Sequence, residues 1–262
     1  MERMRLKDRL AVVTGADSGI GQATAIAFAE EGADVVITYL HDQKGAESTR
    51  REVEKHRRQA LVVQADQRDP AAVHRLFAEI HRQLGVPTIL VNNAGISIEE
   101  KTVKDMTVEE WDNVIKTNLY GPFYCCQQFI RLLEKDHDRP HSTIINITSV
   151  HEDIAYVGYG AYDSAKGGLR NLTRTLALEL AESDINVVNI APGMVLTPMN
   201  QEALDNPKIL AREVQSIPVK RAAEPWEIAQ AAVYVASRAG WYMHGTSLFI
   251  DGGLMQNVGQ IA

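Results

Sequence analysis

Short apolar runs rich in β-branched residues alternate with longer segments of helical periodicity along the chain. Most runs are almost continuously apolar, as expected for strands that helices cover on both faces. The runs that qualify as strands are Leu10–Thr14, Asp34–Thr38, Ala60–Ala65, Ile89–Asn92, Thr143–Thr148, Ile185–Ile190 and Ser247–Ile250. The helical segments between them span 19–31, 45–56, 70–84, 108–135, 159–182 and 225–237. This alternation predicts an α/β fold with a doubly wound parallel sheet.

No linker, repeat or low-complexity segment divides the 262 residues. We therefore expect one domain over 1–262, in which the segment 194–222 forms a mobile helical lid. Pro207 and Pro218 interrupt any long helix there.

Charge and cysteine usage limit the class of protein. The formal net charge of −7 gives no general attraction to phosphate backbones, which argues against a nucleic-acid partner. The chain opens without the apolar segment of a signal peptide and contains no run of 18 apolar residues, so we expect no membrane association. Cys125 and Cys126 are adjacent and lack metal-ligand spacing, so they are expected to be packed thiols. We expect a cytoplasmic protein without a bound metal.

A glycine-rich turn follows the first predicted strand. Gly15, Gly19 and Gly21 permit a tight turn and the close approach of a pyrophosphate to the start of the next helix. The spacing differs from the common G-x-G-x-x-G pattern, and any strand-to-helix turn can contain glycine. The place of the turn, after the first strand, favours a dinucleotide site.

Tyr162 and Lys166 lie four residues apart in a predicted helix and so share one face. An ammonium group near a phenol lowers the phenol pKa, which would make Tyr162 a general acid and base. Ser149 ends the fifth predicted strand. Alternatively, the Tyr–Lys pair lies on a solvated surface and Ser149 only caps a turn.

Asparagines mark two further positions. Asn92 and Asn93 precede Ala94 and Gly95 at a strand end, a pattern that suits a ligand-binding turn but also an ordinary one. Asn118 lies in the middle of a predicted helix, where an amide is mildly unfavourable.

Together, and in this order, these elements resemble the short-chain dehydrogenases/reductases over essentially the whole chain. The resemblance rests on T-G-x-x-x-G-I-G at 14–21, N-N-A-G at 92–95, Asn118, Ser149, Y-x-x-x-K at 162–166 and Pro192-Gly193. It implies a single-domain Rossmann fold with a seven-stranded parallel sheet, a nicotinamide cofactor and a homo-oligomer, expected to be a homotetramer. The terminal segment 254–262 is expected near a subunit interface.

The resemblance also implies catalytic roles. Tyr162 would exchange a proton with the substrate oxygen while hydride passes to or from the nicotinamide, and Ser149 would hold that oxygen. Lys166 would bind the nicotinamide ribose and lower the Tyr162 pKa. Asn118 would hold a helix kink and a water that relays protons to Lys166.

The cofactor is expected to be NADP or NAD. Thr38-Tyr39-Leu40-His41 offers no carboxylate at the second strand end, which argues against strict NAD use. Asp17 in the glycine turn has the wrong charge for a 2′-phosphate, so we expect dual use with NADP slightly favoured. The resemblance implies that Asp66 binds the adenine amine and that Asn92 lines the adenosine side. The full expected cofactor set is Gly15, Asp17, Ser18, Gly19, Ile20, Gly21, Tyr39, Leu40, Asp66, Gln67, Asn93, Ala94, Gly95, Tyr162, Lys166, Pro192, Gly193, Val195 and Thr197.

The substrate signal is thinner. Ser149-Val150-His151-Glu152 resembles the bacterial glucose 1-dehydrogenases of the family, so His151 and Glu152, with Ser149 and Tyr162, are expected to bind a sugar or polyol. Alternatively, this loop is simply solvated. Other possible functions are a ketone or 3-oxoacyl reductase, a dehydratase or epimerase, and a non-catalytic dinucleotide-binding regulator. A regulator need not keep the four catalytic residues, and all four are present in this chain, so the regulator is disfavoured.

Overall fold

The computed structural model describes residues 4–98, 100–136 and 140–257. Within these ranges, seven parallel strands form one sheet in the order β3-β2-β1-β4-β5-β6-β7. The strands are β1 (Leu10–Val13), β2 (Asp34–Tyr39), β3 (Ala60–Gln64), β4 (Ile89–Asn92), β5 (Ser142–Ile147), β6 (Ile185–Pro192) and β7 (Ser247–Ile250). The predicted doubly wound parallel sheet is confirmed. The strand order reverses between β1 and β4, and such a switch point opens a crevice at the carboxyl ends of the strands.

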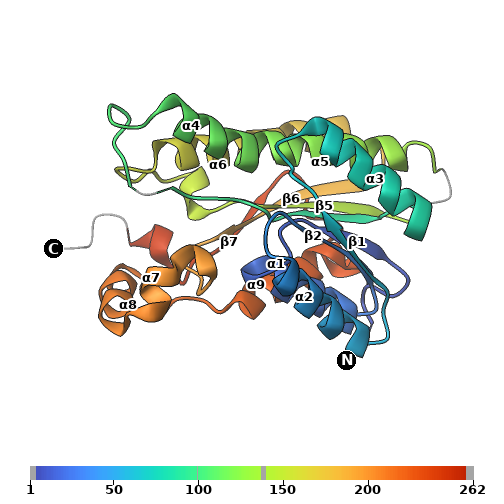
Figure 1. Cartoon of the computed structure of the whole chain (residues 1–262), viewed down its shortest axis with the longest axis horizontal. Coiled ribbons are helices and arrows are strands. Elements are labelled where there is room, and N and C mark those ends of the chain that lie inside the picture. The colour runs from blue at the N-terminus through green and yellow to red at the C-terminus, as the bar shows by residue number, and fades with distance from the viewer. Residues whose placement is uncertain (1–3, 99, 137–139, 258–262) are drawn as a thin grey trace.

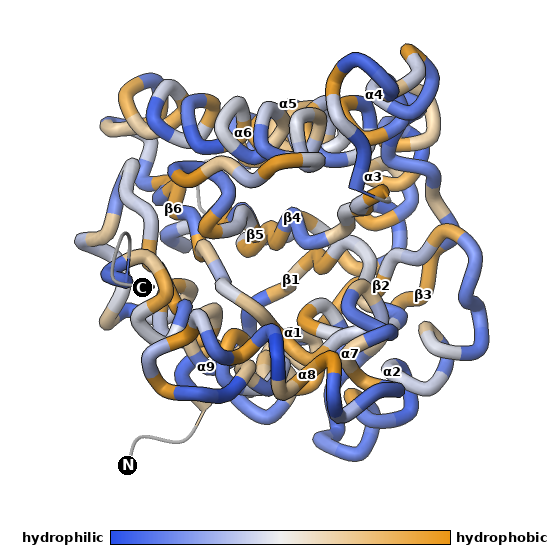
Figure 2. Tube along the Cα trace, turned by 90° about the vertical axis from the view of Figure 1, so that its left-hand side faces the viewer, coloured by the Kyte–Doolittle hydropathy of each residue, from blue (hydrophilic) through white to orange (hydrophobic). Residues whose placement is uncertain are grey.

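Helices cover both faces of the sheet (Figure 1). One layer contains α1 (Gly19–Glu30), α2 (Gln43–Lys55) and α9 (Pro225–Ala236). The other contains α3 (Pro70–Leu84), α4 (Val108–Ile115), α5 (Gly121–Leu133) and α6 (Gly160–Glu179). The hydropathy colouring of Figure 2 shows β1, β4 and β5 as an apolar centre between the two layers. Each face has its own core, with Phe28 and Ile37 in one and Phe77, Phe129 and Ile144 in the other.

The helix predicted over 108–135 is interrupted. A π-helical segment, Lys116–Tyr120, separates α4 from α5 and contains Asn118. π-Helical turns widen a helix locally and occur often at functional sites. A kink at Asn118, implied by the family resemblance, therefore has a counterpart in the structure.

The segment predicted as a lid contains two short helices, α7 (Gln201–Asp205) and α8 (Pro207–Glu213). They lie at one edge of the molecule, at the lower left of Figure 1. Pro207 occupies the first turn of α8, where its missing N–H costs no hydrogen bond. The mobility of the segment stays a prediction. No helix in the described part of the chain is long and apolar enough to cross a membrane.

Candidate active site

The glycine turn between β1 and α1 is built by close backbone contacts. Gly15 and Gly19 adopt left-handed φ values of +60° and +55°, which favour glycine. A Cβ atom on Gly21 would lie 2.3 Å from the Gly15 carbonyl oxygen and 2.4 Å from Asn93 Nδ2. Asn93 Nδ2 donates to the carbonyl oxygens of Thr14 and Gly15, each at 2.9 Å. The second asparagine of the N-N-A-G motif therefore holds the turn in shape.

The start of α1 has the features of an anion site. Ser18, the N-cap residue, makes no side-chain capping hydrogen bond, so the first N–H groups of the helix remain available to a ligand. Across the turn, a Cβ on Gly19 would lie 3.1 Å from the Thr197 methyl group. Thr197 therefore faces the turn from the segment after β6, and the residues present fit a pyrophosphate.

The predicted adenine end lies at the carboxyl ends of β2 and β3. Leu40 and Asp66 line a cavity of about 490 Å³ that continues along α3. Arg68 pairs with Asp66 at 2.7 Å, and this hydrogen bond lowers the pKa of the Asp66 carboxyl. Gln67 Nε2 donates to the carbonyl oxygens of Ala94 and Thr117, at 3.1 and 2.7 Å. Gln67 thus links the N-N-A-G turn to the π-helical segment.

Two residues do not lie where the sequence analysis placed them. Tyr39 is buried, with 9% of its surface exposed, and belongs to the core on the α1 side of the sheet. Asn92 is also buried, and its Nδ2 donates to Asn146 Oδ1 at 2.8 Å and to Cys126 Sγ at 3.3 Å, away from the glycine turn. Neither arrangement offers the predicted contact with a ribose or adenosine, because Tyr39 packs in the core on the α1 side and Asn92 packs against Asn146 and Cys126.

Tyr162 and Lys166 lie side by side in α6, with Lys166 Nζ 5.4 Å from the centre of the tyrosine ring. Lys166 Nζ donates to the Ile147 carbonyl oxygen at 2.8 Å. Burial lowers the pKa of Lys166 to about 8, and the charge of Glu152 opposes this change. Burial raises the pKa of Tyr162 to about 12, and a hydrogen bond with Ser149 opposes that change. Desolvation of the phenol dominates in this structure, so the Tyr162 pKa lies above its ordinary value and not below it as expected.

Asn118 is fully buried within the π-helical segment. Its Nδ2 donates to the Ile96 carbonyl oxygen at 2.8 Å, and its Oδ1 accepts from the Ile96 N–H at 2.9 Å. These two bonds tie the π-helical segment to the chain that follows Gly95. Asn118 therefore fixes the position of the loop next to the glycine turn.

The segment after β6 passes close to β7. The Gly193 N–H donates to the Ile250 carbonyl oxygen at 2.9 Å, and a Cβ on Gly193 would lie 2.9 Å from the Asp251 Cα. Val195 forms an isolated parallel bridge with Ala223. The backbone thus runs from the sheet through Pro192, Gly193 and Val195 toward Thr197, which faces the start of α1.

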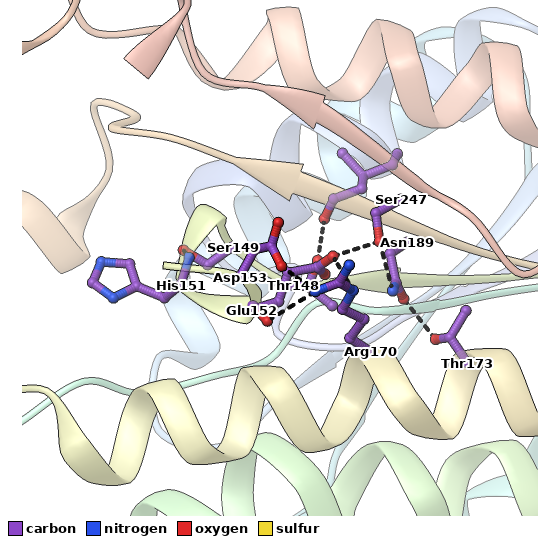
Figure 3. A network of polar contacts seen from close by, with 10 residues as sticks. Thr148, Ser149, His151, Glu152, Asp153, Arg170, Thr173, Asn189 and Ser247 are labelled. Carbon is purple, nitrogen blue, oxygen red and sulfur yellow. Dashed lines mark hydrogen bonds and ion pairs between the residues drawn. The ribbon is translucent and has the colours of Figure 1, made fainter. Parts of the chain in front are cut away.

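Glu152 and His151 point in different directions from the short 3₁₀ helix that joins β5 to α6 (Figure 3). The Glu152 carboxylate is fully buried, accepts a hydrogen bond from Ser247 Oγ, and lies 3.5 Å from Arg170 Nε. A chain of hydrogen bonds continues from Ser247 through Asn189 to Thr173. Glu152 therefore belongs to a buried polar network, and this placement does not favour the predicted contact with sugar hydroxyls.

His151 lies beside Tyr162, and a residue that the sequence analysis did not single out holds it there. Asp163 Oδ1 is 2.6 Å from His151 Nδ1. The His151 ring is also 5.0 and 5.2 Å from the rings of Tyr156 and Tyr159, centre to centre. The signal available in the sequence was a carboxylate directly after the motif tyrosine.

The chain is similar to several known proteins over most of its length. Residues 15–255 match the family model described as enoyl-(acyl carrier protein) reductase. The chain is 40% identical to 3beta-hydroxysteroid dehydrogenase 1 of Eggerthella lenta over 95% of this chain and 94% of the relative. It is 33% identical to glucose 1-dehydrogenase 2 of Bacillus subtilis, over 95% of each chain.

A solved structure is similar over nearly the whole fold. It belongs to a protein of Agrobacterium tumefaciens that is proposed to be a 2-deoxy-D-gluconate 3-dehydrogenase, and it contains bound NADP. The TM-score is 0.87 at 32% identity, and the match covers 98% of this chain and 100% of the other.

Proposed function

Because the chain belongs to the short-chain dehydrogenase/reductase family and is an oxidoreductase, we propose that it interconverts a secondary alcohol and a carbonyl group in a sugar or polyol, with NADP or NAD. The observation that carries the proposal is the placement of Tyr162 and Lys166, one helical turn apart in α6 and buried beside Ser149. The similarity to glucose 1-dehydrogenase 2 supports the substrate class.

The site residues divide the chemistry among them. When bound, the nicotinamide dinucleotide supplies or accepts the hydride. Tyr162 Oη carries the proton that the substrate oxygen gains in reduction, and a pKa of about 12 keeps this phenol protonated near neutral pH. Ser149 Oγ holds the same oxygen, and Lys166 adds a positive charge that stabilises the phenolate left after proton transfer. Oxidation requires the phenolate first, so we expect it to be favoured at higher pH than reduction.

The glycine turn and its neighbours would hold the dinucleotide. The N–H groups at the start of α1 would bind the pyrophosphate, with Thr197 facing them across the turn. Leu40 and Asp66 would hold the adenine end, and the backbone at Pro192 and Gly193 would lie under the nicotinamide.

Discrimination between NADP and NAD is proposed to be weak. His41 is exposed two residues after the end of β2, and the charges of Asp17 and Asp42 act on one another there. The two carboxylates oppose the binding of a 2′-phosphate, whereas the strand end itself carries no carboxylate of the kind typical of NAD enzymes. The related structure with bound NADP supports use of that cofactor.

Charge around the site favours a neutral substrate. Burial raises the pKa of Tyr159, and the charges of Glu100, Glu213 and Asp163 raise it further. A cluster of carboxylates at this position opposes the approach of phosphate-bearing thioesters and leaves uncharged hydroxyl compounds unaffected. This supports a sugar or polyol over a 3-oxoacyl carrier substrate.

The compartment and assembly are also proposals. Cys125 and Cys126 are buried free thiols, and burial raises the pKa of both. Unpaired thiols are typical of a reducing compartment, so we propose that the enzyme acts in the cytoplasm. We also propose that the protein forms a homotetramer.

A panel of aldoses, polyols and simple ketones tests the proposed function, with reduced nicotinamide followed by absorbance for both cofactors. We expect turnover of at least one sugar or polyol, and Tyr162→Phe should remove most of it while leaving cofactor affinity nearly unchanged. Turnover of simple ketones alone would reject the sugar or polyol. Near-normal kcat in Tyr162→Phe would reject Tyr162 as the acid and base.

A further inference from the structure

Asp163 and His151 form a hydrogen-bonded pair next to the proposed acid and base. Asp163 Oδ1 lies 2.6 Å from His151 Nδ1, and both side chains are more than four-fifths buried. The second oxygen, Asp163 Oδ2, accepts the N–H of Tyr156 at 3.1 Å. Because one oxygen is hydrogen-bonded to the Tyr156 N–H and the other to the imidazole, the carboxylate cannot turn without losing both hydrogen bonds.

Aromatic rings fix the plane of the imidazole. The His151 ring packs edge-on against Tyr162, at 5.4 Å and 86°, and against Tyr156 and Tyr159 on other sides. Figure 3 shows the His151 ring directed away from Glu152 and its buried network. The imidazole is therefore held beside Tyr162 by contacts with α6 and with the loop that precedes it.

The pairing with a carboxylate determines which nitrogen of a neutral imidazole carries the hydrogen. An ionised carboxylate only accepts, so Nδ1 must be the protonated nitrogen. Nε2 is then a hydrogen-bond acceptor, and no hydrogen bond within the described part of the chain uses it. An acceptor fixed beside Tyr162 suits a hydroxyl group, which can donate, and not a carbonyl group, which cannot.

We propose that Asp163 is a positioning residue that holds His151 with Nε2 as the acceptor for a second substrate hydroxyl, adjacent to the carbon that reacts at Tyr162. The proposal rests on the proposed function and narrows its substrate class to compounds with neighbouring oxygens, vicinal diols in oxidation and α-hydroxy carbonyl compounds in reduction. The specificity thus comes from a hydrogen bond that a simple secondary alcohol lacks.

Butane-2,3-diol and butan-2-ol form a matched pair of probes, because they differ by one hydroxyl group. We expect the wild-type enzyme to prefer the diol, as a ratio of kcat/KM values. Asp163→Asn and His151→Phe should each lower this ratio roughly tenfold, since one hydrogen bond to the substrate loses its acceptor. Asp153→Asn is the control, because Asp153 pairs with Arg170 on the other side of the short helix, and it should leave the ratio unchanged.

A merely structural Asp163 would lower both kcat/KM values together and leave their ratio intact, which would overturn the proposal. So would a wild-type enzyme that oxidises both alcohols equally well, although the proposed function would then stand. An enzyme that oxidises neither alcohol, and none of the sugars and polyols tested, would instead reject the proposed function.

The tautomer of His151 gives a readout that needs no activity. Long-range ¹H–¹⁵N spectra distinguish an imidazole protonated at Nδ1 from one protonated at Nε2, and the His151→Phe spectrum identifies the signal. We expect the Nδ1-protonated form in the wild-type protein and a change toward the Nε2-protonated form in Asp163→Asn. An Nε2-protonated ring in the wild-type protein, or a spectrum that Asp163→Asn leaves unchanged, would overturn the proposal.

Discussion

Burial moves the pKa values of Lys166 and Tyr162 in opposite directions, and both changes favour the neutral side chains. The Lys166 pKa falls to about 8 and the Tyr162 pKa rises to about 12. Near neutral pH the lysine is charged in a place where charge is unfavourable. The site is therefore maintained at a cost in folding stability, which is common at catalytic positions.

Lys166→Met should stabilise the protein near pH 7 while removing most activity. The fall of the Lys166 pKa from 10.5 to about 8 corresponds to about 3 kcal/mol against the charged form. Loss of the hydrogen bond to the Ile147 carbonyl oxygen offsets about 1 kcal/mol, so we expect a net gain of about 2 kcal/mol in the free energy of unfolding.

The sign of the pH dependence provides the check. Between pH 8 and 10.5 the unfolded chain binds more protons at Lys166 than the folded chain does, so wild-type stability rises with pH in this window. The advantage of Lys166→Met should therefore shrink as pH increases from 8 to 10.5. Urea unfolding near pH 7 and near pH 10 measures the difference in the free energy of unfolding between Lys166→Met and the wild-type protein. A difference that stays constant with pH would contradict the cost assigned to burying Lys166.

Glu152→Gln should affect all substrates equally. The carboxylate is buried between Ser247 and Arg170, next to Asp153, and its charge raises the pKa of Lys166. Removing that charge should move the alkaline limb of the kcat/KM profile to lower pH, by about one unit or less. The pH profiles of a sugar and of a plain alcohol measure this, with Asp153→Asn as the control. A loss of kcat/KM confined to the sugar would instead support the direct contact between Glu152 and sugar hydroxyls that we first expected.

Strand alternation contained more information about single residues than the sequence analysis used. Val35, Ile37 and Tyr39 are alternate residues of β2 and all lie in the same core, so period-two counting places Tyr39 away from the ligand edge. The same counting places Asn92 with Leu90, on the face opposite the glycine turn. Asp163 was not predictable in this way, because its role depends on a histidine twelve residues earlier.

At the level of elements, local patterns predicted the strands and helices but not the break between α4 and α5. The segment Lys116–Tyr120 contains no proline or glycine to mark a break. Its conformation depends on the paired hydrogen bonds between Asn118 and Ile96, which are far apart in the sequence. A long-range contact of this kind has no periodicity of its own, so sequence patterns alone do not reveal it.

Gly21→Ala should disrupt the turn between β1 and α1. The new Cβ would lie 2.3 Å from the Gly15 carbonyl oxygen, so the backbone must move at the proposed pyrophosphate site. We expect a lower melting temperature and loss of the thermal shift that added NADP produces in the wild-type protein.

Gly167→Ala is the matched control for that substitution. Gly167 lies inside α6, and its Cβ would meet only the Glu152 carbonyl oxygen, at 3.8 Å. Alanine should stabilise this helix by about 0.5–1 kcal/mol because it restricts the unfolded chain and favours helix. Retention of cofactor binding in Gly21→Ala would reject the turn as the pyrophosphate site.

For the whole molecule, exposed apolar side chains gather on both helical layers. Tyr120, Phe123 and Leu178 are exposed on the layer of α5 and α6. Trp226, Tyr234, Trp241 and Tyr242 are exposed on α9 and in the turn after it. These layers lie on opposite faces of the sheet (Figure 1), so one contact between two copies cannot cover both. Of the segment 254–262 that was expected near an interface, Leu254 packs against Val214 and Ile217, and residues 258–262 lie outside the described residues.

Two self-complementary patches generate a closed tetramer when their two-fold axes cross at right angles, whereas one patch generates a dimer. Light scattering should therefore give about four times the 29.0 kDa chain mass at micromolar concentration.

Phe123→Glu with Leu178→Glu should leave dimers joined through α9, and Trp226→Glu with Tyr234→Glu should leave dimers joined through the other layer, because each pair places charge in only one contact. All four changes together should give the single chain. Val103→Glu, at an exposed residue outside both patches, should leave the tetramer intact. A wild-type mass near 29.0 kDa would show that neither patch is an interface.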